Sequence, residues 1–290
     1  MTPVPRRVLI GLFVAVLSCS RPAPVVITQL VIDDFEGGDV VGMTREQLLQ
    51  RLTSRLEAAR FVLLKSGEAP PAGGGWVLKV AVGLKEPDAE TGQGSRVLAV
   101  MHLRRYGAPE GFEVRSVAPS APPTNDVEAL QAAARRALDA GLEQVLREAK
   151  ALIDLEPAKD EVLEAKLKVH DEATRVAAAR LLVRRGNPAA LPELLGRLTS
   201  PDLDVVREAV GLLVELKAQG AVNPMIEATR SQGPVVEREI VFAVGAIGGE
   251  DAEAYLDLVA SGHDDPVVRA SAEAALRELR AKRAQQGVSK

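Results

Sequence analysis

Few side chains in this sequence of 290 residues are able to carry catalytic chemistry. It contains one cysteine, Cys19, and three histidines, His102, His170 and His263. No two histidines have the i, i+4 spacing that places a zinc-binding pair on one face of a helix. The sequence contains neither a Gly-x-Ser-x-Gly turn nor a phosphate-binding loop. We therefore expect no catalytic residue, no metal site and no cofactor, and we interpret each histidine as a surface residue.

Acidic side chains gather in one short segment near the start of the chain. They are Asp33, Asp34, Glu36 and Asp39, which surround Gly37 and Gly38. Carboxylate oxygens suit a hard divalent cation, but the segment lacks the ligand spacing of a calcium-binding loop. We interpret it as a solvated turn, with a cation site as the alternative. A second glycine pair, Gly92 and Gly94, lies between two expected strands and is interpreted as a hairpin tip, because a phosphate site requires a following helix.

The residues around Cys19 predict a chemical modification. Arg6 and Arg7 precede an unbroken apolar run at 8–17, and small residues follow it. This order is typical of a secretory signal, and a run of ten residues is too short to span the ~30 Å hydrocarbon core. The Val-Leu-Ser-Cys sequence at 16–19 resembles the lipobox of bacterial lipoproteins. That resemblance implies cleavage before Cys19 and acylation of this residue.

The lipoprotein interpretation divides the start of the chain into a signal peptide at 1–18 and a lipidated spacer at 19–24. Two or three acyl chains hold a protein stably on a membrane, whereas one gives only marginal binding. Ser20, where an aspartate could stand, favours the outer membrane with the protein facing the periplasm. The alternative is an ordinary cleaved signal with an incidental free cysteine. No internal disulfide is expected, because there is no second cysteine.

An arginine that opens an apolar run recurs four times in the second half of the chain. The four positions are Arg175, Arg207, Arg238 and Arg269, at intervals of 32, 31 and 31 residues. Repeats of this length are typical of stacked helix pairs. The expected pairs are 172–185 with 188–198, 204–218 with 222–230, and 235–247 with 251–261. A final helix at 266–285, with a strongly polar end, is expected to close the array.

The last repeat carries a recognisable motif. Its sequence at 265–276, Asp-Pro-Val-Val-Arg-Ala-Ser-Ala-Glu-Ala-Ala-Leu, resembles the HEAT-like repeats of bacterial proteins, including the phycobilisome-lyase type. The resemblance implies an all-α HEAT-like solenoid over 158–290. It also implies that the four aligned arginines form a structural ladder with acids. The acids expected in the ladder are Asp171, Asp202 and Asp264, and Gly233 occupies the corresponding place in the third copy.

The segment 25–156 has a different pattern. Apolar and polar residues alternate at 76–85, which predicts a half-buried strand, and further strands are expected at 25–35, 61–65, 96–106 and 112–117. Thr44 and Gln47 form a capping-box signature before a helix that reaches about residue 60, and a long helix ends near residue 155. We therefore predict an α+β domain, a mainly antiparallel sheet with two helices on one face.

Surface composition narrows the class of partner. The net charge of -4 and the interleaving of lysines and arginines with acids argue against nucleic-acid binding. In a solenoid the exposed positions of the second helices form one continuous face. The residues expected on this candidate partner face are Glu193, Arg197, Glu227, Arg230, Glu253 and Asp257. A solvated face without a partner is the alternative.

These features predict an envelope-anchored lipoprotein that is not an enzyme, whose solenoid is a protein-protein interaction scaffold. Its partners would be envelope proteins, and the membrane contact would be through the lipid anchor. Two alternatives remain open. One is a regulator of envelope assembly that acts through the α+β domain, and the other is a lyase-like enzyme with an unrecognised site.

Overall fold

The computed structural model describes residues 25–35, 38–65, 68–71, 74–85, 95–120, 126–230 and 233–288. The expected signal peptide, Cys19 with its spacer, and the Gly92–Gly94 tip lie outside these residues. So do Glu36 and the side chain of Asp39 from the acidic segment. Asp33 of that segment lies on a strand, 3.7 Å from the amine of Lys79.

The first half of the chain contains a five-stranded sheet with the order β2-β1-β3-β4-β5. The strands are β1 (Val25–Phe35), β2 (Phe61–Leu63), β3 (Trp76–Lys85), β4 (Arg96–Arg105) and β5 (Gly111–Pro119). The prediction of a mainly antiparallel sheet is wrong, because β1 pairs in parallel with both β2 and β3. Only the β3–β4 and β4–β5 pairs are antiparallel. A helix between β1 and β2 returns the chain to the same end of the sheet, so β2 runs in the direction of β1.

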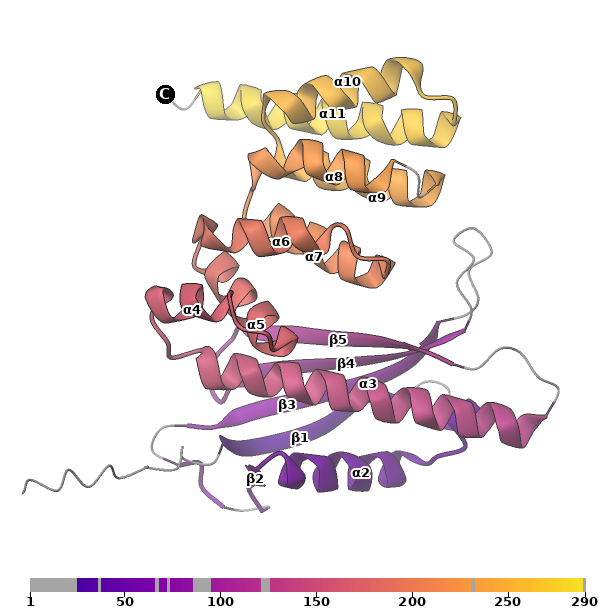
Figure 1. The fold of residues 1–290 in the computed structure, drawn as a ribbon, viewed down its shortest axis with the longest axis vertical. Coiled ribbons are helices and arrows are strands. Elements are labelled where there is room, and N and C mark those ends of the chain that lie inside the picture. Colours follow the sequence, from indigo (N-terminus) through magenta and orange to yellow (C-terminus); the bar gives the residue numbers. More distant parts are fainter. Residues whose placement is uncertain are drawn as a thin grey trace, which may run out of the picture.

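Two helices cover one face of this sheet, as predicted, and they are α2 (Arg45–Ala58) and α3 (Val127–Leu155) (Figure 1). A short helix, α1 (Gly38–Val41), precedes α2. The predicted capping box is present, because the Thr44 hydroxyl accepts from the Gln47 amide and the Gln47 side chain accepts from the Thr44 amide. Alternate residues of β3 and β4 point into the layer between sheet and helices, and Leu78, Val80 and Met101 are fully buried there.

The second half is entirely helical within the described residues. Its helices are α4 (Asp160–Lys166), α5 (Glu172–Arg184), α6 (Leu191–Arg197), α7 (Leu203–Glu215), α8 (Val222–Thr229), α9 (Pro234–Ile247), α10 (Glu250–Gly262) and α11 (Pro266–Val288). Short 3-10 turns at Pro188–Ala190 and Gln219–Ala221 precede α6 and α8. These bounds agree with the helix pairs predicted from the repeat. Successive pairs follow one another along the long axis of the molecule (Figure 1).

The long helix α3 belongs to both halves. One side packs on β4 and β5, and another part contacts α5. The chain changes from sheet to helix pairs after Leu155, close to the boundary expected near Pro157. The buried apolar residues nevertheless form one continuous cluster from Ile27 to Leu276. The sheet is therefore fixed to the first helix pair by a shared core.

Candidate functional site

Two of the four aligned arginines bind backbone carbonyls. Arg175 and Arg269 each donate to two carbonyls that lie five and six residues earlier in the chain. The acceptors are the carbonyls of Val169, His170, His263 and Asp264. Each guanidinium therefore closes the loop before its own helix, which fixes the approach of the chain to α5 and to α11.

The other two arginines act between layers. Arg207 on α7 donates from Nε and Nη2 to the carboxylate of Glu239 on α9, at 2.8 and 3.0 Å. Arg238 is half-buried on α9. The Val267 amide holds the pKa of the Asp265 carboxyl below its usual range, and the charge of Arg238 lowers this pKa further.

The acids expected in the ladder are used differently. Asp171 accepts from the Thr174 amide at 2.8 Å, and Asp202 accepts from the Asp204 amide at 2.9 Å. Both carboxylates therefore cap the free amides at the starts of their own helices. Asp264 contributes its carbonyl to Arg269. The structure differs here from the expected arginine–aspartate ladder, because a carboxylate at the first turn of a helix is already bound by backbone amides.

The six residues of the candidate partner face lie on or at the ends of α6, α8 and α10. They are Glu193, Arg197, Glu227, Arg230, Glu253 and Asp257. Arg197 has only 10% of its side chain exposed, and it lies between the carboxylates of Glu172 and Glu208. Glu193 lies 3.4 Å from Arg175. Glu227 and Arg230 are exposed and pair with each other at 2.6 Å.

Both acids of this face on α10 are paired too, because Glu253 and Asp257 bind Arg280 at 2.9 and 3.1 Å. Each of the six side chains is therefore in an ion pair within the chain. Contact of this face with a partner stays a prediction.

A charged hollow of about 440 Å³ lies between β5, α3, α5 and α7, and we call it the junction cleft. Its charged lining consists of the basic residues Lys85, Arg115, Arg180, Arg197 and Arg207, and of the acidic residues Glu113, Glu172, Asp202, Asp204, Glu208 and Glu215. At one end Arg96, from β4, binds Asp204 at the start of α7 at 2.8 Å. In the middle Arg180 binds Glu208 at 2.6 Å and also donates to the carbonyl of Glu113 on β5. An ion pair thus joins the sheet to α7, and a hydrogen bond joins the sheet to α5.

A buried acid lies beneath the junction cleft. Glu148 on α3 is 9% exposed and accepts from the Gln144 amide nitrogen at 3.2 Å. Burial raises the pKa of the Glu148 carboxyl, and the nearby carboxylate of Glu208 raises it further. Arg180, the Gln144 hydrogen bond and Arg197 oppose this shift in part. The Glu148 carboxyl therefore takes up a proton more readily than an exposed glutamate does.

An apolar hollow of about 380 Å³, the α7–α9 groove, lies on the other side of α7. Its apolar lining comprises Leu203, Val206, Val210, Val214, Val236, Ile240 and Ala243. The ion pair of Arg207 with Glu239 borders it. Phe242 follows on α9 and is 57% exposed, which is unusual for a large aromatic side chain on a helix of this core.

Gly211 and Arg207 line both hollows, so the exposed ridge of α7 separates them. Gly211 is exposed, and a Cβ added to it would meet nothing within 4 Å. The ridge is therefore lowest at this residue, which connects the two hollows. A glycine inside a helix costs ~0.5–1 kcal/mol relative to alanine. The sequence signal for this low point is Gly211 itself, a glycine in the middle of an apolar helical run.

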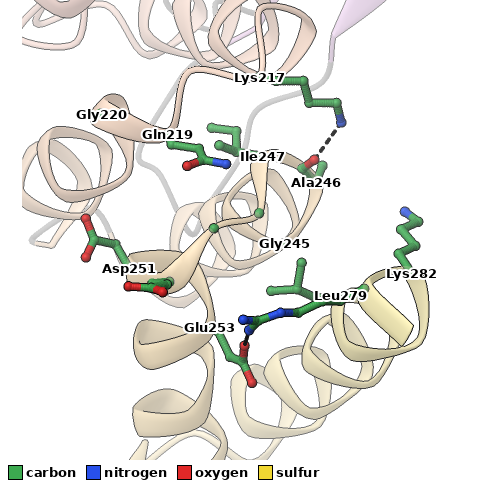
Figure 2. Close-up of a pocket in the computed structure, with 14 residues that line it drawn as sticks. Lys217, Gln219, Gly220, Gly245, Ala246, Ile247, Asp251, Glu253, Leu279 and Lys282 are labelled. Atoms are coloured by element: carbon green, nitrogen blue, oxygen red, sulfur yellow. Dashed lines mark hydrogen bonds and ion pairs between the residues drawn. The ribbon is translucent and has the colours of Figure 1, made fainter. Parts of the chain in front are cut away.

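A larger hollow than these two, about 940 Å³, lies where α9 turns into α10 (Figure 2). Lys217 has a positive φ of 53° and donates to the carbonyl of Ala246 at 2.6 Å. On another wall Glu253 binds Arg283 at 2.9 Å. The acids in the first turn of α10, among them Glu250, occupy the positive end of that helix. This hollow therefore has no preference for an anion.

Comparisons with protein-family models and with curated proteins returned no match. Within the described ranges, no helix is both long enough and apolar enough to cross a membrane. The same residues contain no cluster of three or more histidine, cysteine or acidic side chains suited to a metal ion.

Proposed function

We propose that this protein is a lipid-anchored scaffold of the bacterial cell envelope, whose HEAT-like solenoid binds a protein partner across the α7 ridge. The recurring arginines and the succession of helix pairs support the solenoid. In such arrays each unit contacts only its neighbours, and extended binding surfaces result.

The observation that supports the proposal is that the charged junction cleft and the apolar α7–α9 groove lie on the two sides of α7. Protein interfaces combine an apolar centre with a polar rim. The α7–α9 groove supplies aliphatic walls, and Phe242 is exposed on α9 three residues after Glu239, which lines the groove. The junction cleft supplies charged and hydrogen-bonding groups on the other side of Gly211.

The lipid on Cys19 has a separate part in the proposed mechanism. Confinement to a membrane surface raises the effective concentration of the solenoid towards partners on that surface. Intact-mass measurement of the mature protein tests this part. We expect a chain that begins at Cys19 and carries two or three acyl groups, whereas an unmodified chain would contradict the anchoring.

The partner-binding part is tested by photocrosslinking in the native envelope. A photoreactive phenylalanine analogue replaces Phe242 on α9, a helix that lines the α7–α9 groove. The matched control carries it at Leu258, which is 69% exposed on α10, a helix that contributes no residue to either hollow. We expect one envelope protein, identified by mass spectrometry, to crosslink at residue 242 and not at residue 258. Equal crosslinking at both positions would show random surface collision and would contradict the proposal.

A further inference from the structure

The outer edge of the sheet carries a hydrogen-bonding pattern of its own. The Ser120 amide donates to the Ser95 carbonyl at 3.0 Å, which makes the 95–120 pair a hydrogen-bonded pair. Bonded and non-bonded pairs alternate along antiparallel strands. By the register of β4 with β5, the backbone groups of Gly111, Glu113, Arg115 and Val117 therefore point away from β4.

Helix α5 already binds the first part of this edge. Arg184 donates to the Gly111 carbonyl at 3.0 Å, and Arg180 donates to the Glu113 carbonyl. The outward amide and carbonyl groups of Arg115 and Val117 have no hydrogen-bond partner among the described residues. An open strand edge of this kind is a template for a further strand.

The open part of the edge forms a wall of the junction cleft. Arg115, Ser116 and Val117 line the cleft together with residues of α7. Its volume of about 440 Å³ suits one short extended segment and is too small for the sheet of a second molecule. A segment placed there lies beside Gly211, over which a side chain can reach the α7–α9 groove.

The charge of the junction cleft indicates which charge the bound segment carries. Its lining has five basic and six acidic side chains, so one carboxylate is in excess. Most of these charges are paired within the chain, but Glu215 is exposed on α7 without an ion pair among the described residues. A basic residue beside the extended segment would complement this carboxylate.

From these observations we propose that the partner binds as an added β-strand. An extended segment of the partner protein pairs with Arg115 and Val117 on the edge of β5, an aliphatic side chain enters the α7–α9 groove, and a basic residue faces Glu215. This inference rests on the proposed function, since it specifies the partner segment at the same site. Strand addition takes affinity from main-chain hydrogen bonds and specificity from pockets for alternate side chains.

The test uses the full chain and a fluorescent peptide, Lys-Val-Thr-Val-Thr-Val-Lys. Fluorescence anisotropy measures binding, and hydrogen exchange measures protection of individual amides. We expect the peptide to bind when its concentration reaches about 1 mM. Hydrogen exchange at the Arg115 and Val117 amides should then slow about tenfold or more. The exchange of amides on β1 should not change. Methylation of alternate amide nitrogens blocks hydrogen bonding along one edge of the peptide, and the two possible methylation patterns block opposite edges. One pattern should therefore abolish binding, and the other should leave it unchanged.

Two protein variants sharpen the test. Glu215→Lys should weaken peptide binding several-fold, whereas the charge reversal Glu110→Lys, outside the cleft, should not. Absence of binding at about 1 mM, or binding without protection of Arg115 and Val117, would overturn strand addition. The crosslink from residue 242 to an envelope protein would remain in that case, so failure of this inference is distinguishable from failure of the proposed function.

Discussion

The sheet region and the helical region bury their apolar side chains in different ways. In the sheet region one broad layer lies between the strands and two helices, and residues such as Leu103, Leu138 and Leu142 are fully buried there. In the helical region α7 contacts α9 and α9 contacts α11, so each layer is covered only by its neighbours. This difference accounts for the two hollows beside α7, because a helix that is covered only by its neighbouring layers leaves space along its exposed ridge.

The contact between the two regions differs from both. Apolar side chains of α3 continue into α5, but ion pairs of Arg96 and Arg180 surround this contact. These pairs are mostly buried, and Arg180 also donates to the Glu113 carbonyl. The junction cleft exists because charged side chains hold the helices beside the strand edge instead of filling the space completely.

The largest expected effect comes from the helix that belongs to both regions. Leu142→Ala on α3 should cost about 2–5 kcal/mol in the free energy of unfolding, because it leaves a cavity in a fully buried site. Urea denaturation measures this loss, and both regions should unfold together. Val127→Ala, at an exposed position on the same helix, should change the free energy by less than about 0.5 kcal/mol. Unfolding of the sheet alone would contradict the shared core.

An equivalent substitution far from the junction should act locally. Leu256 on α10 is also fully buried, and Leu256→Ala should destabilise its own layer by up to the same ~2–5 kcal/mol. Because a helix array transmits stability mainly between neighbours, hydrogen exchange should accelerate in α9, α10 and α11 and stay unchanged in β3 and β4. Acceleration throughout the sheet would remove the distinction between the two regions.

Breaking the charged junction should have an intermediate effect. Arg180→Ala removes the ion pair with Glu208 and the hydrogen bond to the Glu113 carbonyl, and we expect a loss of about 1–3 kcal/mol. Arg180→Lys retains the positive charge, but a lysine amine cannot bind Glu208 and the Glu113 carbonyl in the same arrangement as a guanidinium. Its loss of unfolding free energy should be smaller than that of Arg180→Ala. The control is Arg277→Ala, which removes an exposed ion pair on α11 and should change the free energy of unfolding little. Equal stability of all three variants would contradict the structural role of the junction.

The smallest effect concerns the buried acid beneath the cleft. Because burial raises the pKa of Glu148 in the folded protein, its charged form destabilises the fold at neutral pH. The folded state then binds the proton more tightly than the unfolded state, so stability rises as the pH falls from above the folded pKa to the unfolded pKa. Glu148→Gln should therefore raise Tm at pH 7, and the gain should disappear at acidic pH. A gain that is constant with pH would exclude titration of Glu148 as its cause.

Some of this architecture was predictable from local patterns. The helix pairs follow from the 31–32-residue interval of the arginines, and the start of α2 follows from Thr44 and Gln47. The direction of β1 and β2 was not predictable in the same way, because alternation of side chains is identical in parallel and antiparallel strands. Capping residues such as Asp171 also misled the expected pairing, since a carboxylate before an arginine fits a salt bridge and a helix cap equally well.

The site depended on long-range contacts that no local pattern encodes. Arg180 and Glu113 are 67 residues apart in the sequence, and they meet only because α3 places α5 beside β5. Glu148 on α3 is buried near the charges of Arg180 on α5 and Glu208 on α7, which are 32 and 60 residues away in the sequence. The open edge at Arg115 and Val117 follows from strand order, which the sequence pattern of β5 does not specify.

Whether a partner protein lies across the α7 ridge is tested most directly by filling the lowest point of this ridge, at Gly211. Gly211→Trp fills the space over the ridge, and Gly196→Trp on α6 is the matched control, because an added Cβ meets nothing within 4 Å at either exposed glycine. The measurement is the yield of the crosslink from residue 242 to the envelope partner. We expect Gly211→Trp to abolish the crosslink and Gly196→Trp to leave it intact. An undiminished crosslink in the Gly211→Trp protein would contradict a partner across the α7 ridge.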